Sequence, residues 1–131
     1  MNYDRYIGIP YKVNGRDRTG VDCYGLIHLL YKELKGIELA SFDSVVTGGT
    51  RGDLRKVARA IEKEKETWVK VENPEPFDVV LLRTGKYSWH VGLVISKTKM
   101  IHSLNGTDSI IEDFTKPYWK NRVQEFRRCT M

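Results

Sequence analysis

The sequence predicts an α+β fold, in which helices come first along the chain and an antiparallel sheet follows. Two observations carry this prediction. In the first half of the chain, leucine, valine and isoleucine recur at helical spacing. In the second half, short apolar runs are separated by turn residues, as expected for strands. The length of 131 residues corresponds to one domain, which we place over residues 1–131.

The first predicted element is an amphipathic helix from about Asp22 to Lys35. Residues 1–22 are rich in glycine and polar side chains and are interpreted as turns and loop. Four leucines then recur at helical spacing, with lysine and glutamate on the other face, in the run CYGLIHLLYKELKG. Asp22 occupies the N-cap position, and Gly36 supplies the stop.

A loop and a second helix are expected next. Residues 41–52 include the run TGGT and are interpreted as a loop. Asp53 can cap a helix that continues to about Glu66. Its inward-facing residues would be Leu54, Val57, Ala58 and Ile61.

About five strands are expected in the remaining sequence. The first begins at Asp78, in the run DVVLLR, and the others are HVGLVIS, KMIHSL, DSIIEDF and RVQEFRR. The uninterrupted apolar character of HVGLVIS suits a buried central strand. A hairpin turn at about Ser96 to Lys99 would join it to KMIHSL.

Charge and composition exclude several classes of function. Lysine and arginine number 22 against 17 acidic residues, which gives a net charge of +5. The basic residues are dispersed, so the surplus indicates either an anionic partner, such as cell-wall polymer, or an ordinary soluble surface. We expect no specific nucleic-acid partner, because no basic helix or aromatic-interleaved groove is evident.

Our expectations about localisation and cofactors rest on patterns that are absent from the sequence. No run approaches the roughly 20 apolar residues of a membrane span, so none is expected. The start MNYDRYIGIPY does not have the pattern of a signal peptide, so we expect synthesis in the cytoplasm. The two cysteines, Cys23 and Cys129, show no metal-ligand spacing. We therefore expect no metal, no cofactor and no structural disulfide.

Cys23 is the candidate nucleophile, because it sits in the first turn of the predicted helix. Unpaired N–H groups and the macrodipole favour an anion there, so we expect a lowered thiol pKa. The polar approach VNGRDRTGVD suits a loop that leads into an open cleft. From position alone, the alternative of a small buried core cysteine stays open.

Three histidines are candidate partners for a cysteine nucleophile. His28 lies five residues after Cys23 on the same helix and is expected to face elsewhere, at the helix surface or core edge. His90 begins a predicted buried strand and can reach across a cleft to a helix start. In the hairpin, His102 would lie beside His90 and accept a hydrogen bond from its ring. Two unrelated strand histidines are the alternative.

These residues carry a family resemblance. The segment GIPYKVNGRDRTGVDCYGLIHLLYKEL resembles the nucleophile signature of NlpC-type cysteine peptidases, which are cell-wall endopeptidases of papain-like fold. The segment FDVVLLRTGKYSWHVGLVISKTKMIHS is similar to the second signature of that family. The likeness runs from about Ile7 to Leu104. It implies a nucleophile-bearing helix packed on an antiparallel sheet.

The resemblance also implies an activity and roles for residues. The expected activity is cleavage of peptidoglycan stem peptides, typically at the bond from γ-D-glutamate to a diamino acid. Cys23 would be the nucleophile, His90 the general base and His102 the polar third residue. Tyr11 matches a tyrosine beside the oxyanion site, and Asp22 would orient a substrate amine, cap the helix, or do both.

Two positions depart from the family pattern. Tyr24 follows the nucleophile where many relatives have serine, so a reshaped subsite is expected. Phe77-Asp78 replaces the usual Gly-Asp before the strand that carries the base.

A bare domain of this type resembles the tail-assembly peptidases of tailed bacteriophages. The resemblance implies a virion component at the tail tip that opens the wall for DNA entry, with other phage tail proteins as partners. The alternatives are a structural tail-assembly module with little catalytic turnover and a bacterial amidase of the same fold.

Overall fold

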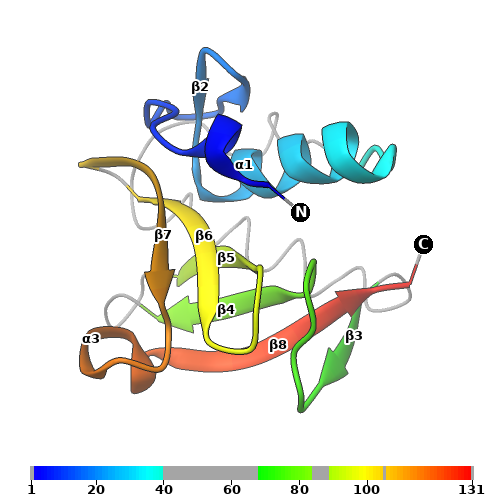
Figure 1. The fold of residues 1–131 in the computed structure, drawn as a ribbon, viewed down its shortest axis with the longest axis vertical. Helices are drawn as coiled ribbons and strands as arrows, with labels where there is room; N and C mark the ends of the chain where they lie inside the picture. Colours follow the sequence, from blue (N-terminus) through cyan, green and yellow to red (C-terminus); the bar gives the residue numbers. More distant parts are fainter. Residues whose placement is uncertain (1, 40–67, 84–88, 105, 131) are drawn as a thin grey trace.

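A computed structural model describes residues 2–39, 68–83, 89–104 and 106–130 of the chain. The predicted loop 41–52 and the predicted helix 53–66 lie outside the described residues. In the described part, a helix packs on an antiparallel sheet (Figure 1). This arrangement confirms the predicted α+β fold.

The described elements fall into two groups. The N-terminal group contains η1 (Asp4–Tyr6), β1 (Arg16–Asp17), β2 (Gly20–Val21), α1 (Cys23–Leu30) and η2 (Tyr31–Lys35). The C-terminal group contains β3 (Trp68–Val71), β4 (Val79–Arg83), β5 (Trp89–Val94), β6 (Lys99–Leu104), β7 (Thr107–Asp113), α3 (Pro117–Lys120) and β8 (Val123–Cys129).

The predicted helix from Asp22 to Lys35 is confirmed, with one change in its last turn. The Asp22 side chain caps α1 by accepting the Gly25 N–H at 2.7 Å. The turn η2 that follows is π-helical, and Gly36 ends it with a φ of 66°, in the left-handed region that favours glycine. All eight residues of α1 are buried, so this part is apolar on every side rather than amphipathic. Within the described ranges, no helix is long and apolar enough to cross a membrane.

The described sheet has six strands in the order β3-β8-β4-β5-β6-β7, all antiparallel. The predicted central position of β5 is confirmed, because it lies between β4 and β6. A tight turn joins β5 to β6, in which the Ile95 N–H donates to the Lys99 carbonyl at 2.9 Å. The predicted hairpin is therefore confirmed.

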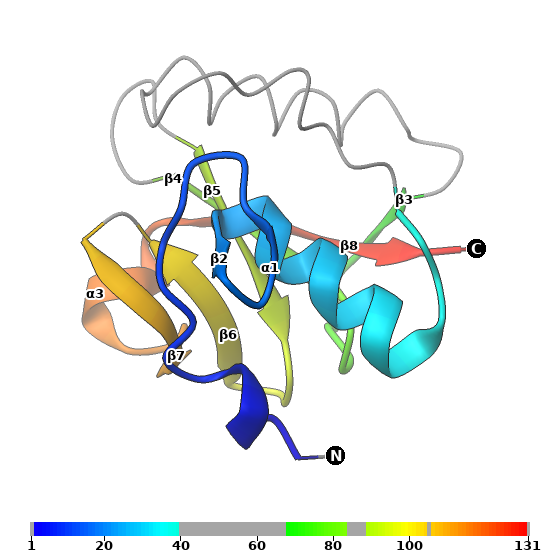
Figure 2. The ribbon, with the colours of Figure 1, turned by 90° about the horizontal axis from the view of Figure 1, so that it is seen from above.

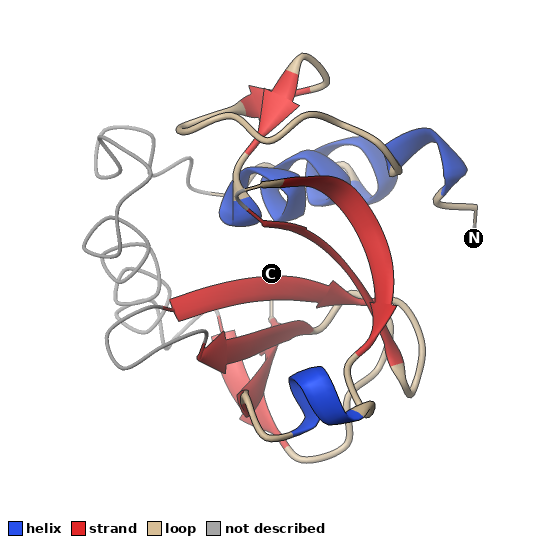
Figure 3. Ribbon diagram, turned by 90° about the vertical axis from the view of Figure 1, so that its left-hand side faces the viewer, coloured by secondary structure: helices blue, strands red, loops and turns tan. Residues whose placement is uncertain are grey.

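The two faces of the sheet carry separate apolar cores. Side chains such as Val91 and Leu93 face α1, which lies over β5 and β6 (Figure 2). Val94, Met100 and Trp119 belong to the second core, on the side of the short helix α3 (Figure 3). Burial on both faces explains the apolar run 91–94 of β5, since neither face is open to solvent there.

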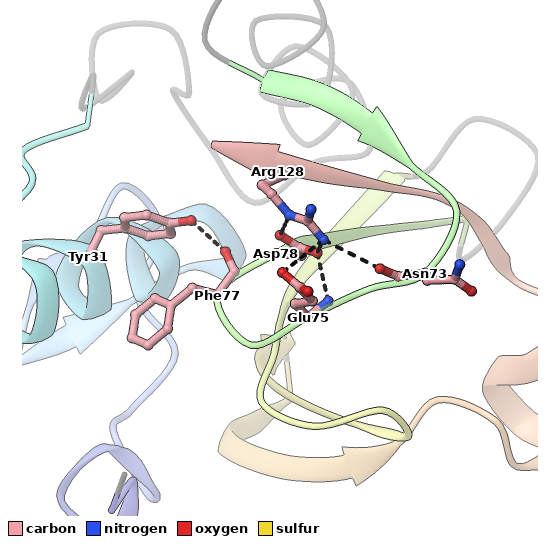
Figure 4. A network of polar contacts seen from close by, with 6 residues as sticks. All are labelled: Tyr31, Asn73, Glu75, Phe77, Asp78 and Arg128. Carbon is pink, nitrogen blue, oxygen red and sulfur yellow. Dashed lines mark hydrogen bonds and ion pairs between the residues drawn. The ribbon is translucent and has the colours of Figure 1, made fainter. Parts of the chain in front are cut away.

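The start of β4 is held by a polar network around Asp78 (Figure 4). Arg128 donates to both carboxylate oxygens of Asp78, each at 3.0 Å, and so ties β4 to the end of β8. Phe77, which precedes it, has a φ of 74°. That value lies in the left-handed region, which favours glycine. The Tyr31 hydroxyl donates to the Phe77 carbonyl and helps to hold this conformation.

Candidate active site

The start of α1 is inserted between β5 and β6. Leu93 pairs with Ile101, and Val94 pairs with Met100. If this register continued along the two strands, Val91 would lie opposite Ser103. Instead, the Val91 N–H bonds the Cys23 sulfur, and the Ser103 hydroxyl donates to the Val21 carbonyl at 3.2 Å. The Cys23 sulfur therefore lies beside the peptide that joins His90 to Val91.

Cys23 is a neutral thiol in this structure. Burial, and then the neighbouring Asp22 carboxylate, raise its pKa to about 12. The N–H groups of Val91 and Tyr24 and the Arg16 guanidinium lower the pKa by less. The sequence-based expectation of a lowered thiol pKa is therefore wrong. The helix start does supply favourable N–H groups, but desolvation of a side chain only 3% exposed outweighs them.

His90 and His102 lie side by side, which confirms that prediction. Nε2 of His90 is 2.8 Å from Nδ1 of His102. Gly92 lies opposite His102 in the continued register, and a Cβ there would come within 3.4 Å of the His102 Cβ. The same Cβ would lie 2.9 Å from the Met100 sulfur, so the missing side chain at Gly92 leaves room for Met100 and His102.

His90 is a neutral imidazole. Burial, and then His102, lower its pKa to about 3. Its Nδ1 atom is buried, and within the described part of the chain nothing hydrogen-bonds it. The structure thus brings Cys23 next to the His90 backbone, but the thiol and Nδ1 are not hydrogen-bonded to each other.

Glu112 is a member of the site that sequence reasoning missed. Its Oε2 lies 3.2 Å from Nε2 of His102, and the Trp119 indole N–H donates to the same oxygen. In the sequence, Glu112 looks like an outward residue of an edge strand. The signal that could have found it is the hairpin register, which pairs Glu112 with Met100, two residues from His102.

Asp22 performs the predicted N-cap role, since it accepts the Gly25 N–H. It also accepts from Arg16 Nη1 at 2.7 Å and from the Asn14 N–H at 3.2 Å. These donors hold the loop before the helix against its first turn. Contact with a substrate amine, the other role considered for Asp22, stays a prediction.

Tyr11 and Tyr24, the two tyrosines predicted for the site, both contact the segment that leads into α1. Tyr11 is half-buried and forms a parallel bridge with Val21. Tyr24 is buried, and the Arg16 guanidinium lies 5.4 Å from its ring centroid. Their roles at an oxyanion site and a subsite stay predictions.

His28 and Cys129 lie apart from this group. His28 is buried in the core rather than at the helix surface, and burial lowers its pKa. Cys129 pairs with Trp68 in the β3–β8 ladder, and both cysteines are free thiols. In the part of the chain that the structure describes, no three His, Cys, Asp or Glu side chains are grouped as metal ligands.

The geometry defines a class of protein. A cysteine at a helix start, set into an antiparallel sheet beside a histidine, is the arrangement of the papain-like α+β fold. The NlpC/P60 family model matches residues 8–128. The chain belongs to the NlpC/P60 family.

Curated relatives include two bacterial proteins of greater length. Over 126 residues, the chain is 26% identical to a protein of Escherichia coli K12 named murein DD-endopeptidase MepS/murein LD-carboxypeptidase. It is 24% identical over 126 residues to a probable endopeptidase NlpC homolog of Haemophilus influenzae. Each alignment covers 96% of this chain and 58% of the relative, so the chain spans less than two thirds of those proteins.

Solved structures share the fold. An NLP/P60-family protein of Staphylococcus aureus superposes with a TM-score of 0.68 at 21% identity, covering 97% of this chain and 38% of that one. The NlpC/p60 domain of the peptidoglycan hydrolase SagA superposes with a TM-score of 0.62 at 19% identity, covering 97% and 91%.

Proposed function

We propose that the protein is a peptidoglycan hydrolase, a cysteine endopeptidase in which Cys23 is the nucleophile and His90 the general base. One observation carries the proposal: the Cys23 sulfur accepts the N–H directly after His90, whose Nδ1 has no hydrogen-bond partner in the described structure. The relatives named as murein and NlpC endopeptidases supply the substrate class.

The protonation states define the chemistry. With pKa values of about 12 for Cys23 and about 3 for His90, both groups are neutral at rest. As the sulfur forms a bond to the amide carbonyl carbon, the thiol proton moves to Nδ1 of His90. The imidazolium then donates this proton to the leaving amine as the C–N bond breaks. Neutral His90 next takes a proton from water as the water attacks the thioester, and it returns this proton to the Cys23 sulfur as the C–S bond breaks.

The carbonyl oxygen becomes negative during attack and needs hydrogen-bond donors. The backbone N–H of Cys23, at the helix start, and the Tyr11 hydroxyl are the proposed donors. Loss of one such donor typically costs about 10²–10³ in rate. Asp22, with its negative charge, and Tyr24 are proposed to contact the stem peptide next to the cleaved bond. The proposed bond joins γ-D-glutamate to a diamino acid.

Digestion of purified peptidoglycan tests the proposal. Wild type is expected to release stem-peptide fragments, whose masses identify the cleaved bond. Cys23→Ala should release none, whereas Cys129→Ala, the matched control for loss of a thiol, should behave as wild type. Fragments from Cys23→Ala, or none from folded wild type, would contradict the proposed function.

One observation favours a second candidate, a structural module with little turnover. The Cys23 side chain is 3% exposed, so a substrate must displace neighbouring groups to reach it. A folded wild type that releases no fragments would support this candidate. The tail tip of a bacteriophage, with tail proteins as partners, is the proposed setting for either function, and it rests on the sequence resemblance.

A further inference from the structure

We propose that Glu112 is a positioning residue for His90, acting through His102 to fix the tautomers of both imidazole rings. The consequence is that Nδ1 of His90 is left without a proton and can take the one from the Cys23 thiol. The significance for catalysis rests on the proposed function, whereas the tautomers are a property of the resting protein.

The contacts form a chain that begins at the carboxylate. Glu112 Oε2 lies 3.2 Å from His102 Nε2, and His102 Nδ1 lies 2.8 Å from His90 Nε2. Both rings are buried, with His90 1% and His102 2% exposed. Three of the four ring nitrogens thus face one partner each, and His90 Nδ1, which has none in the described structure, ends the chain, so each proton position affects the next.

The proton positions follow from the donors and acceptors available. An ionised carboxylate only accepts hydrogen bonds, so the proton of neutral His102 must be on Nε2. Nδ1 of His102 is then bare and can only accept, which requires the proton of neutral His90 to be on Nε2. Nδ1 of His90 therefore keeps its lone pair.

Trp119 holds the carboxylate and both rings in place. Its indole N–H donates to Glu112 Oε2, and its ring lies over His90, with centroids 5.9 Å apart and planes at 24°. The same indole meets His102 edge-on, at 5.2 Å and 88°. Glu112 also raises the pKa of His102 against the lowering caused by burial, as expected if its charge acts on this ring.

Removing the carboxylate should allow both tautomers to reverse. In Glu112→Leu, nothing requires a proton on Nε2 of His102. The Nδ1–H form of His102 would donate to His90 and place the His90 proton on Nδ1, where it blocks thiol deprotonation. Glu112→Gln should keep the wild-type tautomers, because its amide oxygen can accept from both His102 and Trp119 while the charge is lost.

The test is nitrogen-15 NMR of the imidazole rings in the full chain without substrate. We expect Nε2-protonated His90 and His102 in wild type and Glu112→Gln, and a population of Nδ1-protonated His90 in Glu112→Leu. Wild-type His90 protonated on Nδ1 would overturn the inference without any variant. An unchanged His90 tautomer in folded Glu112→Leu would also overturn it.

Kinetics on a stem peptide provide the second readout. Glu112→Leu should lower kcat by about 10–100-fold with little change in KM, as for other supporting residues behind a catalytic group. Glu112→Gln should lower kcat by a smaller factor. The matched control is Asp113→Asn, at the neighbouring half-buried residue whose carboxylate bonds Thr115, and it should stay within about twofold of wild type. If wild type shows the expected tautomers but does not hydrolyse the peptide, the proposed function is refuted and the inference about the tautomers stands.

Discussion

At the residue scale, the central feature is a buried pair of neutral groups. Desolvation dominates both shifts, raising the pKa of Cys23 to about 12 and lowering that of His90 to about 3. The helix start, which is usually associated with a thiolate, does not overcome this cost. Cys23, the proposed nucleophile, is therefore expected to lose its proton during attack and not before it.

The reactivity of Cys23 toward iodoacetamide should reflect this state. In a Cys129→Ser background, alkylation at pH 7 should be slower than that of N-acetylcysteine and should keep increasing with pH above 9, because only the thiolate reacts. Unfolding in urea should remove the difference, since exposed cysteine has an ordinary pKa. A rate that reaches its plateau below pH 7 would contradict a buried neutral thiol.

Stability should fall on acidification, because the pKa values of His28, His90 and His102 are all lowered in the folded state. An unfolded histidine takes up a proton near pH 6.5, whereas folded His90 does so near 3. The stability contributed by neutral His90 is present above pH 6.5 and is lost as pH falls toward 3. From pH 7 to 5, His90 alone should remove about 2 kcal/mol of unfolding free energy.

Urea unfolding at several pH values measures this loss. The matched variant is His90→Asn, whose unfolding free energy should depend less steeply on pH than that of wild type. Equal slopes for the two proteins between pH 7 and 5 would show that His90 titrates normally in the folded state.

At the element scale, the site depends on how closely the loop before α1 approaches the helix. A Cβ on Gly25 would lie 1.9 Å from the Gly15 carbonyl oxygen, so this contact exists only with glycine. The same loop carries Arg16, which bonds Asp22. Correct placement of Cys23 thus depends on Gly25, two positions further along the helix.

Gly25→Ala should therefore destabilise the protein, by about 1–3 kcal/mol from the forced shift of backbone. This sign is opposite to the usual effect, since alanine in a helix is favoured over glycine by about 1 kcal/mol. Urea unfolding measures the change, with the exposed helical position Lys32→Ala as control. A Gly25→Ala protein as stable as wild type would show that the loop can move away at little cost.

In the turn before β4, a large residue occupies a backbone conformation that glycine would adopt without strain. Phe77 has a φ of 74°, yet its ring is buried and packs edge-on against Tyr31 at a centroid distance of 5.4 Å. Burial of this ring offsets the backbone cost. The departure from the family's Gly-Asp pattern is thus a packing feature of this chain.

Two substitutions of Phe77 separate the effect of ring burial from that of backbone strain. Phe77→Ala should cost about 3–5 kcal/mol from the lost ring. Phe77→Gly should be more stable than Phe77→Ala by about 1 kcal/mol, because glycine adopts this φ without strain. Chemical unfolding compares them directly, and an alanine variant more stable than the glycine variant would contradict the account.

Elements with a strong local pattern could be predicted from the sequence, and weakly patterned ones could not. The helix from Asp22 and the β5–β6 hairpin follow from leucine spacing and from two apolar runs around a short turn. β3 was missed, because its four residues gain strand structure only by pairing with β8. The two-residue strands β1 and β2 and the short helices η1 and α3 were missed for the same reason: tertiary contacts fix them.

At the scale of the whole molecule, the site forms where distant segments meet. The pairing of His90 with His102 was predictable from one hairpin, whereas Glu112 and Trp119 required the positions of β7 and α3. The lowered thiol pKa was wrongly expected because burial is a property of the folded molecule. Sequence reasoning proposed the reacting residues but could not predict the environment that sets their protonation.

The most direct test of the central claim is a double-mutant cycle in kcat/KM on one stem peptide, with Cys23→Ala, His90→Ala and the double variant. If the two side chains act as one nucleophile–base unit, each single substitution should lower kcat/KM by at least about 10³-fold, and the double variant should be no worse than either single one. Losses that multiply in the double variant, or hydrolysis that persists in Cys23→Ala, would contradict the claim.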